Sequence, residues 1–174
     1  YDEIKTGGRV YWVCPRVDDE ESSVINRNAF LRKYFGGLGV AMVHGRMASD
    51  EKSRAIADFH SGKCRILAGT TVIEVGIDVP EASLIVIESA EMFGLSQLHQ
   101  LRGRVGRGAD QSHCILMTAD KLSSDARIRI KTMTDTTDGF VIAEADLKLR
   151  GPGDIQGLQQ SGVVDLKLAD IVKD

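Results

Sequence analysis

The chain has 174 residues, of which 43% are hydrophobic and 5% aromatic, and its formal net charge is −3. This length and apolar content suffice for one hydrophobic core with a small appendage. The mildly acidic charge provides no bulk attraction to nucleic acid, so any contact with DNA must come from a local basic patch. No apolar run approaches the ~20 residues that a membrane-spanning helix needs, and we expect no membrane contact.

Short apolar runs and amphipathic stretches alternate along the first 118 residues. Strands are predicted at 9–14, 40–44, 64–69, 83–88 and 112–118, and helices at 22–34 and 50–60, with further helical segments between the later strands. Ser49 is the expected N-cap of the second helix, which Gly62 ends. Continuous Val, Ile and Leu runs are typical of strands buried on both faces. The alternation predicts an α/β domain with a mostly parallel sheet, right-handed crossovers and ligand loops at the strand ends.

Three cysteines, Cys14, Cys64 and Cys114, stand far apart, each within an apolar run. There is no Cys-x-x-Cys pair, and the four histidines show no ligand spacing with the cysteines. This pattern predicts neither a disulfide framework nor a metal site. We therefore expect small buried thiols in a reduced, cytoplasmic setting.

The pattern changes after residue 118. Two helices are predicted at 123–134 and 140–149, and a glycine-rich stretch follows at 150–162. Several glycines around Pro152 argue against continued helix and for a loop with a specified backbone path. A loop of this length is usually either functional or disordered. Composition alone favours a flexible exit toward another domain.

Three arginines alternate with glycines in the segment Gln97–Gly108, which reads QLHQLRGRVGRG and has no acidic residue. Arginine has a permanent planar charge with forked donors that match a phosphate, and glycine lets the backbone approach a ligand closely. Arg102, Arg104 and Arg107 therefore suit an arginine-finger element, which stabilises charge on a transferring phosphoryl group. From this segment alone, an exposed basic helix end that complements a helix dipole is an equally good interpretation.

A second segment, Gly69–Pro80, reads GTTVIEVGIDVP and follows an apolar strand. Gly76 allows the close approach of a ligand, and Asp78 can accept hydrogen bonds from ribose hydroxyls. Thr70 and Thr71 offer hydroxyl and backbone donors to a DNA phosphate. In the structural alternative, the two threonines cap a turn and Asp78 orders the Val-Pro junction that follows it. Residue chemistry alone does not separate these interpretations.

Together the two segments resemble motifs V and VI of superfamily 2 helicases. With the sequence HGRM at 44–47, they look like the RecG-type branch-migrating DNA helicases and their transcription-repair coupling relatives. The tail resembles the translocation motif of RecG through DGF at 138–140, AEADL at 143–147, RGPGDIQG at 150–157 and QSG at 160–162. The resemblance covers nearly the whole chain, from about Gly8 to the end.

The resemblance implies a RecA-like fold of the P-loop NTPase type. Residues 1–118 would form the second motor domain, and residues 119–174 an appended helical hairpin with a translocation loop. ATP would be held in a cleft against a first motor domain of the same full-length protein, which would bind most of the Mg²⁺. Arg104 and Arg107 match the arginines of motif VI and are the expected catalytic residues.

Three further residues complete the expected nucleotide-binding set. Gln100 matches the leading glutamine of motif VI, while Gly76 and Asp78 belong to motif V. The chain has no GxxxxGK(S/T) phosphate loop and no strand-ending Asp-Glu pair for magnesium. We therefore expect it to be inactive alone as an ATP hydrolase.

The expected DNA contacts come from the loops and the tail. A histidine at a strand end is more typical of a structural residue, but motif position makes His44, with Arg46, a candidate for a DNA-facing loop. Thr70 and Thr71 are the candidates in motif V. In the tail, Arg150 and Gln160 match the translocation motif. Gln159 stands where many relatives have arginine, so no charged contact is carried over there.

The resemblance implies the C-terminal motor domain of an ATP-dependent DNA helicase that remodels stalled replication forks and branched recombination intermediates. Its partners would be forked DNA and the first motor and DNA-wedge domains of its own chain, in a monomeric protein. One alternative is the corresponding motor of a transcription-repair coupling factor. The other is a non-catalytic scaffold that binds nucleic acid, which fold similarity alone does not exclude.

Overall fold

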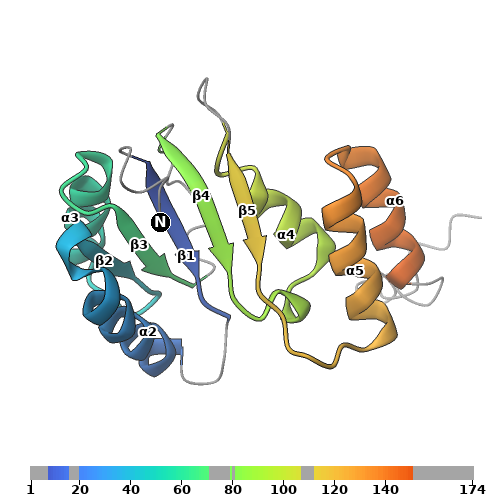
Figure 1. Ribbon diagram of the computed structural model, residues 1–174, viewed down its shortest axis with the longest axis horizontal. Coiled ribbons are helices and arrows are strands. Elements are labelled where there is room, and N and C mark those ends of the chain that lie inside the picture. Colours follow the sequence, from blue (N-terminus) through green and yellow to red (C-terminus); the bar gives the residue numbers. More distant parts are fainter. Residues whose placement is uncertain (1–7, 16–19, 71–78, 80, 107–111, 151–174) are drawn as a thin grey trace, which may run out of the picture.

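A parallel sheet forms the centre of the molecule (Figure 1). The computed structural model describes residues 8–15, 20–70, 79, 81–106 and 112–150. Within that part of the chain the strand order is β2-β3-β1-β4-β5 and every pairing is parallel. The strands are β1 (Arg9–Val13), β2 (Val40–Val43), β3 (Ile66–Gly69), β4 (Ala82–Ile87) and β5 (His113–Leu116). The predicted parallel α/β architecture is confirmed.

The sheet has two edges that run across the strand ends. The strands pair in step, so that Val13 of β1 is opposite Gly69 of β3 and Ile87 of β4. We call the side where the strands end the carboxyl edge and the side where they begin the amino edge. Loops that follow a strand therefore lie at the carboxyl edge, and loops that precede a strand lie at the amino edge.

Helix α2 (Glu20–Phe35) lies on one face of the sheet (Figure 1). Its Leu31 is fully buried and packs with Val10, Val40 and Ile66. Val10, Val40 and Ile66 point to this face, and their neighbours along each strand point to the opposite face, because successive side chains of a strand alternate between the two faces of a sheet. We call this side the α2 face.

Helices α3 (Ser49–His60) and α4 (Leu95–Arg102) cover the other face. From α3, Phe59 stacks on Tyr11 with 5.0 Å between ring centroids. From α4, Leu95, Leu98 and Leu101 are fully buried against the sheet. Their spacing of three residues places them on one side of the helix. This face holds the larger of the two buried clusters.

Helices α5 (Ser124–Asp135) and α6 (Gly139–Arg150) form a hairpin beside α4 (Figure 1). The Ser123 hydroxyl accepts a hydrogen bond from the Ala126 amide at 3.2 Å and so caps α5. Met133 and Ile142 belong to the same buried cluster as the leucines of α4. The hairpin is therefore continuous with the core of the sheet domain. The predicted loop at 150–162 lies outside the described residues except for Arg150.

Most element boundaries agree with the sequence predictions, but the start of α3 differs. Ala48, not Ser49, is the N-cap, and Ser49 is the first helical residue. The cap forms without a hydroxyl because the Glu51 carboxylate accepts a hydrogen bond from the Ala48 amide at 3.4 Å. Two short 3₁₀ turns were also not predicted, Gly36–Leu38 and Ala90–Met92, labelled η1 and η3.

Candidate functional site

The predicted arginine element begins at the end of α4 and turns back toward β5. Its backbone is fixed by hydrogen bonds from the Arg104 amide to the Leu101 carbonyl at 3.0 Å and from the Val105 amide to the Arg102 carbonyl at 3.3 Å. Leu101 and Val105 are both buried, so the half-buried Arg104 sits between two apolar anchors. Such anchoring limits where the Arg104 guanidinium can reach. Gln100 is exposed on the last turn of α4.

Gly106 ends the described part of this turn in a conformation that favours glycine. Its φ is +83°, and a Cβ built there would lie 2.5 Å from the Ser112 hydroxyl oxygen. Both conditions disfavour any residue with a side chain. Arg107, the second predicted finger, follows directly in the sequence and lies outside the described residues.

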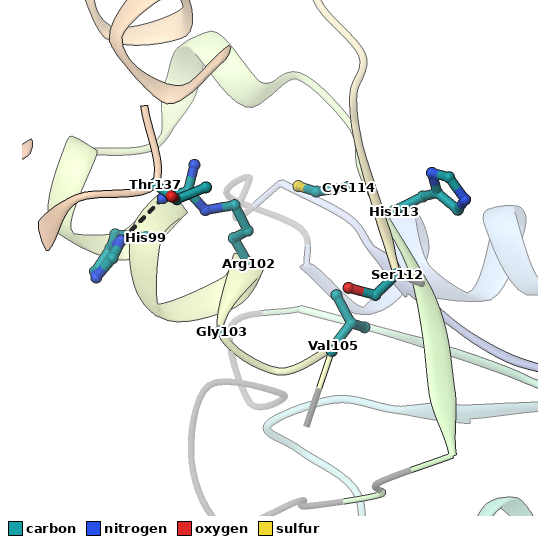
Figure 2. Close-up of a pocket in the computed structure, with 9 residues that line it drawn as sticks. His99, Arg102, Gly103, Val105, Ser112, His113, Cys114 and Thr137 are labelled. Atoms are coloured by element: carbon teal, nitrogen blue, oxygen red, sulfur yellow. Dashed lines mark hydrogen bonds between the residues drawn. The ribbon is translucent and has the colours of Figure 1, made fainter. Parts of the chain in front are cut away.

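Arg102 contacts the helical hairpin. Its Nη1 donates hydrogen bonds to the carbonyl oxygens of Met133 and Thr136, both at 2.8 Å. Its Nη2 lies 3.3 Å from His99 Nδ1 (Figure 2). The last carbonyls of a helix have no partner within the helix and form the negative end of its dipole. Arg102 therefore caps α5 across the joint between α4 and the hairpin.

A second arginine strengthens this joint from the other side. Arg129 of α5 donates from Nη2 to the carbonyl oxygen of Glu91 in η3 at 2.8 Å. Contacts from both helices thus fix the hairpin against η3 and α4. These elements precede residues 103–106, which we call the arginine turn. We call Arg102, Arg129 and their carbonyl partners the hairpin joint. The basic helix-end interpretation was partly correct for Arg102, although the dipole it complements belongs to α5.

A pocket of about 400 Å³ opens between the hairpin joint and the start of β5 (Figure 2). His99, Arg102, Val105, Ser112, Cys114 and Thr137 are among the residues that line it. Burial raises the pKa of the Cys114 thiol to about 11, although the charge of Arg102 opposes the shift. Cys114 is therefore a neutral thiol near neutral pH, as expected for a structural cysteine.

At the carboxyl edge, the predicted DNA-facing loop follows β2. His44 is buried, whereas Arg46 is exposed. The loop is fixed by a hydrogen bond from the Met47 amide to the His44 carbonyl at 3.3 Å and by one from Lys52 Nζ to the Gly45 carbonyl at 2.7 Å. The burial of His44 favours its structural interpretation. Arg46 is the side chain of this loop that reaches solvent.

The predicted motif V segment connects the two edges of the sheet. Thr70 follows β3 at the carboxyl edge, and Val79 lies just before β4 at the amino edge, where its carbonyl accepts from the Ala82 amide at 2.9 Å. Thr70 is fully buried, so its hydroxyl is not open to a DNA phosphate in this conformation. Thr71, Gly76 and Asp78 lie outside the described residues.

A buried acidic residue at the carboxyl edge was not recognised in the sequence. Glu88 follows β4, and its Oε1 accepts a hydrogen bond from Trp12 Nε1 at 2.8 Å and an ion pair from Arg27 Nε at 2.7 Å. The guanidinium of Arg27 also lies over the Phe30 ring, 5.1 Å from its centroid. This network ties α2 to β1 and β4 beneath the edge. The sequence signal that could have identified this network is weak. It consists of an acidic residue, Glu88, at the end of an apolar strand, and of Trp12 and Arg27 as possible donors far away in the sequence.

Of the residues predicted in the tail, Arg150 is the last residue of α6 and belongs to the described part of the chain. Arg150 is exposed there and pairs through Nη2 with Asp146 Oδ2 at 2.8 Å. Gln159 and Gln160 lie outside the described residues. Over the described ranges, no group of three His, Cys, Asp or Glu side chains could hold a metal ion, and none of the helices is long and apolar enough to cross a membrane.

Two family models match the chain. The model for the helicase conserved C-terminal domain matches residues 1–109. The model for domain 3, C-terminal, of the ATP-dependent DNA helicase RecG matches residues 136–174. The first includes the arginine turn and the second includes helix α6.

Individual relatives match along almost the whole chain. The ATP-dependent DNA helicase RecG of Acidithiobacillus ferridurans is 50% identical over 98% of this chain, which covers 26% of that protein. The RecG of Escherichia coli K12 is 48% identical, with 98% and 25% covered. The chain therefore spans about a quarter of the length of these relatives.

Solved structures agree with the observed architecture. A structure of RecG bound to a three-way DNA junction matches with a TM-score of 0.73 and 45% identity, over 88% of this chain and 20% of that one. The C-terminal domain of the DEAD-box protein Dbp5 matches with a TM-score of 0.59 and 22% identity, over 74% of this chain and 71% of that one. The second similarity concerns the fold alone, and both are consistent with a RecA-like helicase domain.

Proposed function

Since the chain belongs to the helicase conserved C-terminal domain family and is of the RecG type, we propose that it is the C-terminal motor domain of an ATP-dependent DNA helicase. In the full-length protein it would remodel stalled replication forks and branched recombination intermediates. The observation that carries this proposal is the hairpin joint, where Arg102 connects the arginine turn directly to α5. The pair Arg104 and Arg107 argues against a non-catalytic scaffold, which needs no arginines to contact a phosphate.

The amino edge is the nucleotide-facing side in this proposal. Arg104 is presented on a rigid turn between two buried anchors, and its forked donors suit a polyphosphate. Gly103 and Gly106 leave the backbone beside it without side chains. Gln100 and Arg104, with Arg107 and Asp78 from outside the described residues, would hold ATP against the first motor domain. Bound ATP would supply the free energy of phosphoryl transfer, and Mg²⁺ would be bound mainly by that other domain.

The arginines would stabilise negative charge on the transferring phosphoryl group. An arginine supplied from a neighbouring domain contributes roughly 10³ to 10⁵ in turnover in other phosphoryl-transfer enzymes. The chain by itself lacks the phosphate loop and the magnesium-binding acid pair, so we propose that it has no ATP turnover alone. It completes a site whose other half belongs to the first motor domain.

The hairpin joint would transmit movement of the arginine turn to the translocation loop. Arg102, the last residue of α4, is two residues before Arg104 and ends on the carbonyls of Met133 and Thr136, so a displacement of the turn would move α5 with it. Through α6, that displacement reaches Arg150 and the segment with Gln160. Such coupling requires an element with two arrangements whose equilibrium both sites bias, and we propose that the hairpin is that element.

The carboxyl edge would follow the DNA backbone. Arg46 is the exposed cation of the loop after β2, and Thr71 is the second candidate. His44 and Thr70 are buried, so we assign them to the support of these loops. Forked DNA, a DNA-wedge domain and the first motor domain are the proposed partners of a monomeric protein. The RecG-specific match over residues 136–174 favours this assignment over a transcription-repair coupling factor.

The experiment uses the full-length protein and forked DNA. We expect Arg104→Ala and Arg107→Ala each to lower DNA-stimulated ATP turnover by at least roughly 10³-fold, because transition-state charge loses its partner. Binding of a non-hydrolysable ATP analogue should change by only a few-fold. Arg54→Ala, which removes an exposed arginine from α3, is the matched control and should turn over ATP like the wild type. Wild-type turnover in both finger variants would refute the role of the arginines.

A further inference from the structure

Helix α4 has two sides of different character. The side against the sheet is made of buried leucines, Leu95, Leu98 and Leu101. Ser96, His99 and Arg102 have the same spacing of three residues and lie on the side that faces the hairpin. Apolar burial has no preferred direction, whereas a hydrogen bond requires defined positions of its two partners. The polar side of α4 therefore fixes where the hairpin lies.

Helices α4 and α6 lie side by side and run in opposite directions (Figure 1). At the end of α4, Arg102 reaches the carbonyl of Thr136, three residues before α6 begins. At the start of α4, the hydroxyl of Ser96 reaches Asp146, near the end of α6. Helix α4 is therefore attached to the hairpin at both of its ends, and the two attachments use different residues.

The carboxylate of Asp146 joins two partners at the second attachment. Its Oδ2 accepts a hydrogen bond from Ser96 Oγ at 2.9 Å and pairs with Arg150 Nη2 at 2.8 Å. The Asp146 side chain is only 14% exposed, whereas that of Arg150 is 56% exposed. A carboxylate that loses much of its hydration needs partners that replace the lost water. Ser96 and Arg150 provide them, and more than half of the Arg150 side chain stays open to solvent.

The same helix contains an ordinary ion pair with which Asp146 can be compared. Glu144 and Lys148 are also four residues apart, and their charged atoms are 2.8 Å from each other. Their side chains are 65% and 74% exposed, and both belong to α6. Exposed pairs of this kind contribute little to stability. Asp146 differs because it is largely buried and because it reaches a second helix, so a pair along one helix does not account for it.

The position of Arg150 gives this contact its meaning. Arg150 is the last residue of α6, and the glycine-rich tail follows it in the sequence. In the proposed function, the arginine turn after α4 contacts ATP and the tail follows DNA. Through Asp146, the start of the tail is attached to the same helix that leads into the arginine turn. This attachment is separate from that of Arg102, which holds the end of α5.

We propose that Asp146 is a positioning residue for DNA translocation, which holds Arg150 and the start of the tail on the first turn of α4. This inference rests on the proposed function and adds a residue to it. Asp146 acts through Ser96 and Arg150, and its own carboxylate contacts neither ATP nor DNA. It engages one side of the Arg150 guanidinium and leaves other donors of the fork for a DNA phosphate. Loss of Asp146 therefore uncouples hydrolysis from movement but removes no cation from the DNA-facing surface.

The test measures ATP turnover, fork affinity and base pairs unwound per ATP for variants of the full-length protein on forked DNA. Asp146→Ala should keep turnover and affinity within a few-fold of the wild type, while base pairs unwound per ATP fall about fivefold or more. Ser96→Ala leaves the pair of Asp146 and Arg150 intact and should lower the same ratio, whereas Ser96→Thr, which keeps a hydroxyl, should preserve it. Glu144→Ala is the matched control, because it breaks an exposed pair of the same helix, and it should unwind like the wild type.

The proposal is overturned if Asp146→Ala and Ser96→Ala both unwind as many base pairs per ATP as the wild type, or if Glu144→Ala lowers this ratio as much as they do. A loss of fork affinity as large as the loss of unwinding would also contradict it, because Asp146 would then act on binding. Thermal unfolding shows whether each variant is folded, and Asp146→Asn, which keeps an acceptor for Ser96, replaces an unstable Asp146→Ala. These outcomes leave the proposed function intact, since only a wild-type protein without DNA-stimulated turnover would refute that.

Discussion

The polar residues at the two edges of the sheet differ in burial and in what they contact. At the amino edge, Arg104 lies on a rigid turn and Arg102 spans to the carbonyls of α5. At the carboxyl edge, His44, Thr70 and Glu88 are buried, and Glu88 is engaged by Trp12 and Arg27. The first edge joins the sheet domain to the helical hairpin. The second holds its loops in place from beneath.

In the proposed function, this difference separates contacts that transmit movement from contacts that support the fold. A charged side chain that ends on the carbonyls of another helix couples the positions of two elements. A buried acid satisfied by two donors contributes instead to the stability of a single arrangement. We therefore expect substitutions at the amino edge to change coupling more than stability, and substitutions at the carboxyl edge to do the reverse. The following predictions test that division, beginning with the largest effect on stability.

Loss of the Glu88 carboxylate should destabilise the fold strongly. Glu88→Ala leaves the partly buried Trp12 indole N–H and the Arg27 guanidinium without their acceptor, and leaving such donors unsatisfied costs about 2–3 kcal/mol. The matched control is Glu81→Ala, because Arg9 and Glu81 are also 2.7 Å apart but the Glu81 side chain is 54% exposed. An exposed pair contributes about 0.5 kcal/mol. Urea denaturation of both variants measures the difference, and equal losses would contradict it.

A side chain at Gly106 should be less costly than loss of Glu88 but still measurable. Gly106→Ala places a Cβ against the Ser112 hydroxyl at a positive φ, and we expect a loss of about 1–2 kcal/mol. Gly37→Ala is the control, because a Cβ there would have no atom within 4 Å. Thermal unfolding compares the two. If Gly106→Ala were as stable as Gly37→Ala, the turn would not be rigid.

The smallest effect near neutral pH concerns the buried thiols. Burial, and then the charge of Glu88, raise the pKa of Cys14 to about 12, whereas burial raises that of Cys114 to about 11. The folded state thus keeps protons that the unfolded thiols lose near pH 9, so the contribution of the two thiols to stability does not change well below pH 9 and falls as the pH rises toward 12. Below that range, alkylation should modify Cys14 more slowly than Cys114, because Cys14 is fully buried and Cys114 is only partly buried. Mass spectrometry after iodoacetamide treatment checks the order, and faster reaction of Cys14 would contradict it.

Local sequence patterns were sufficient for the secondary structure. The parallel strands were predicted from short continuous apolar runs. Strands buried on both faces of a sheet need apolar side chains at successive positions, so Val, Ile and Leu follow one another. The hairpin helices were predicted within one or two residues, since Ser123 caps α5 with its own hydroxyl. At α3 the same reasoning predicted Ser49 as the N-cap, one residue after the observed N-cap, Ala48. The Glu51 carboxylate accepts a hydrogen bond from the N-cap amide, and this contact does not depend on the side chain of the N-cap residue.

Contacts between distant residues could not be predicted in this way. Trp12 and Glu88 are 76 positions apart, and Arg102 and Met133 are 31 apart. Sequence chemistry marked Arg102 as a cation near a helix end, but its partner depends on how α5 packs against α4. The burial of His44 and Thr70 likewise depends on neighbouring elements. The candidate residues were therefore identified by type, while their division between the two edges required the structure.

The measurement that tests the central claim most directly compares ATP turnover with fork unwinding in full-length Arg102→Ala. If the hairpin joint transmits movement, turnover on forked DNA should stay within a few-fold of the wild type while base pairs unwound per ATP fall by roughly tenfold. Arg102→Lys, which keeps the charge but not the forked geometry, should give an intermediate value. Unwinding that falls only in proportion to ATP turnover, or that does not fall, would contradict the account.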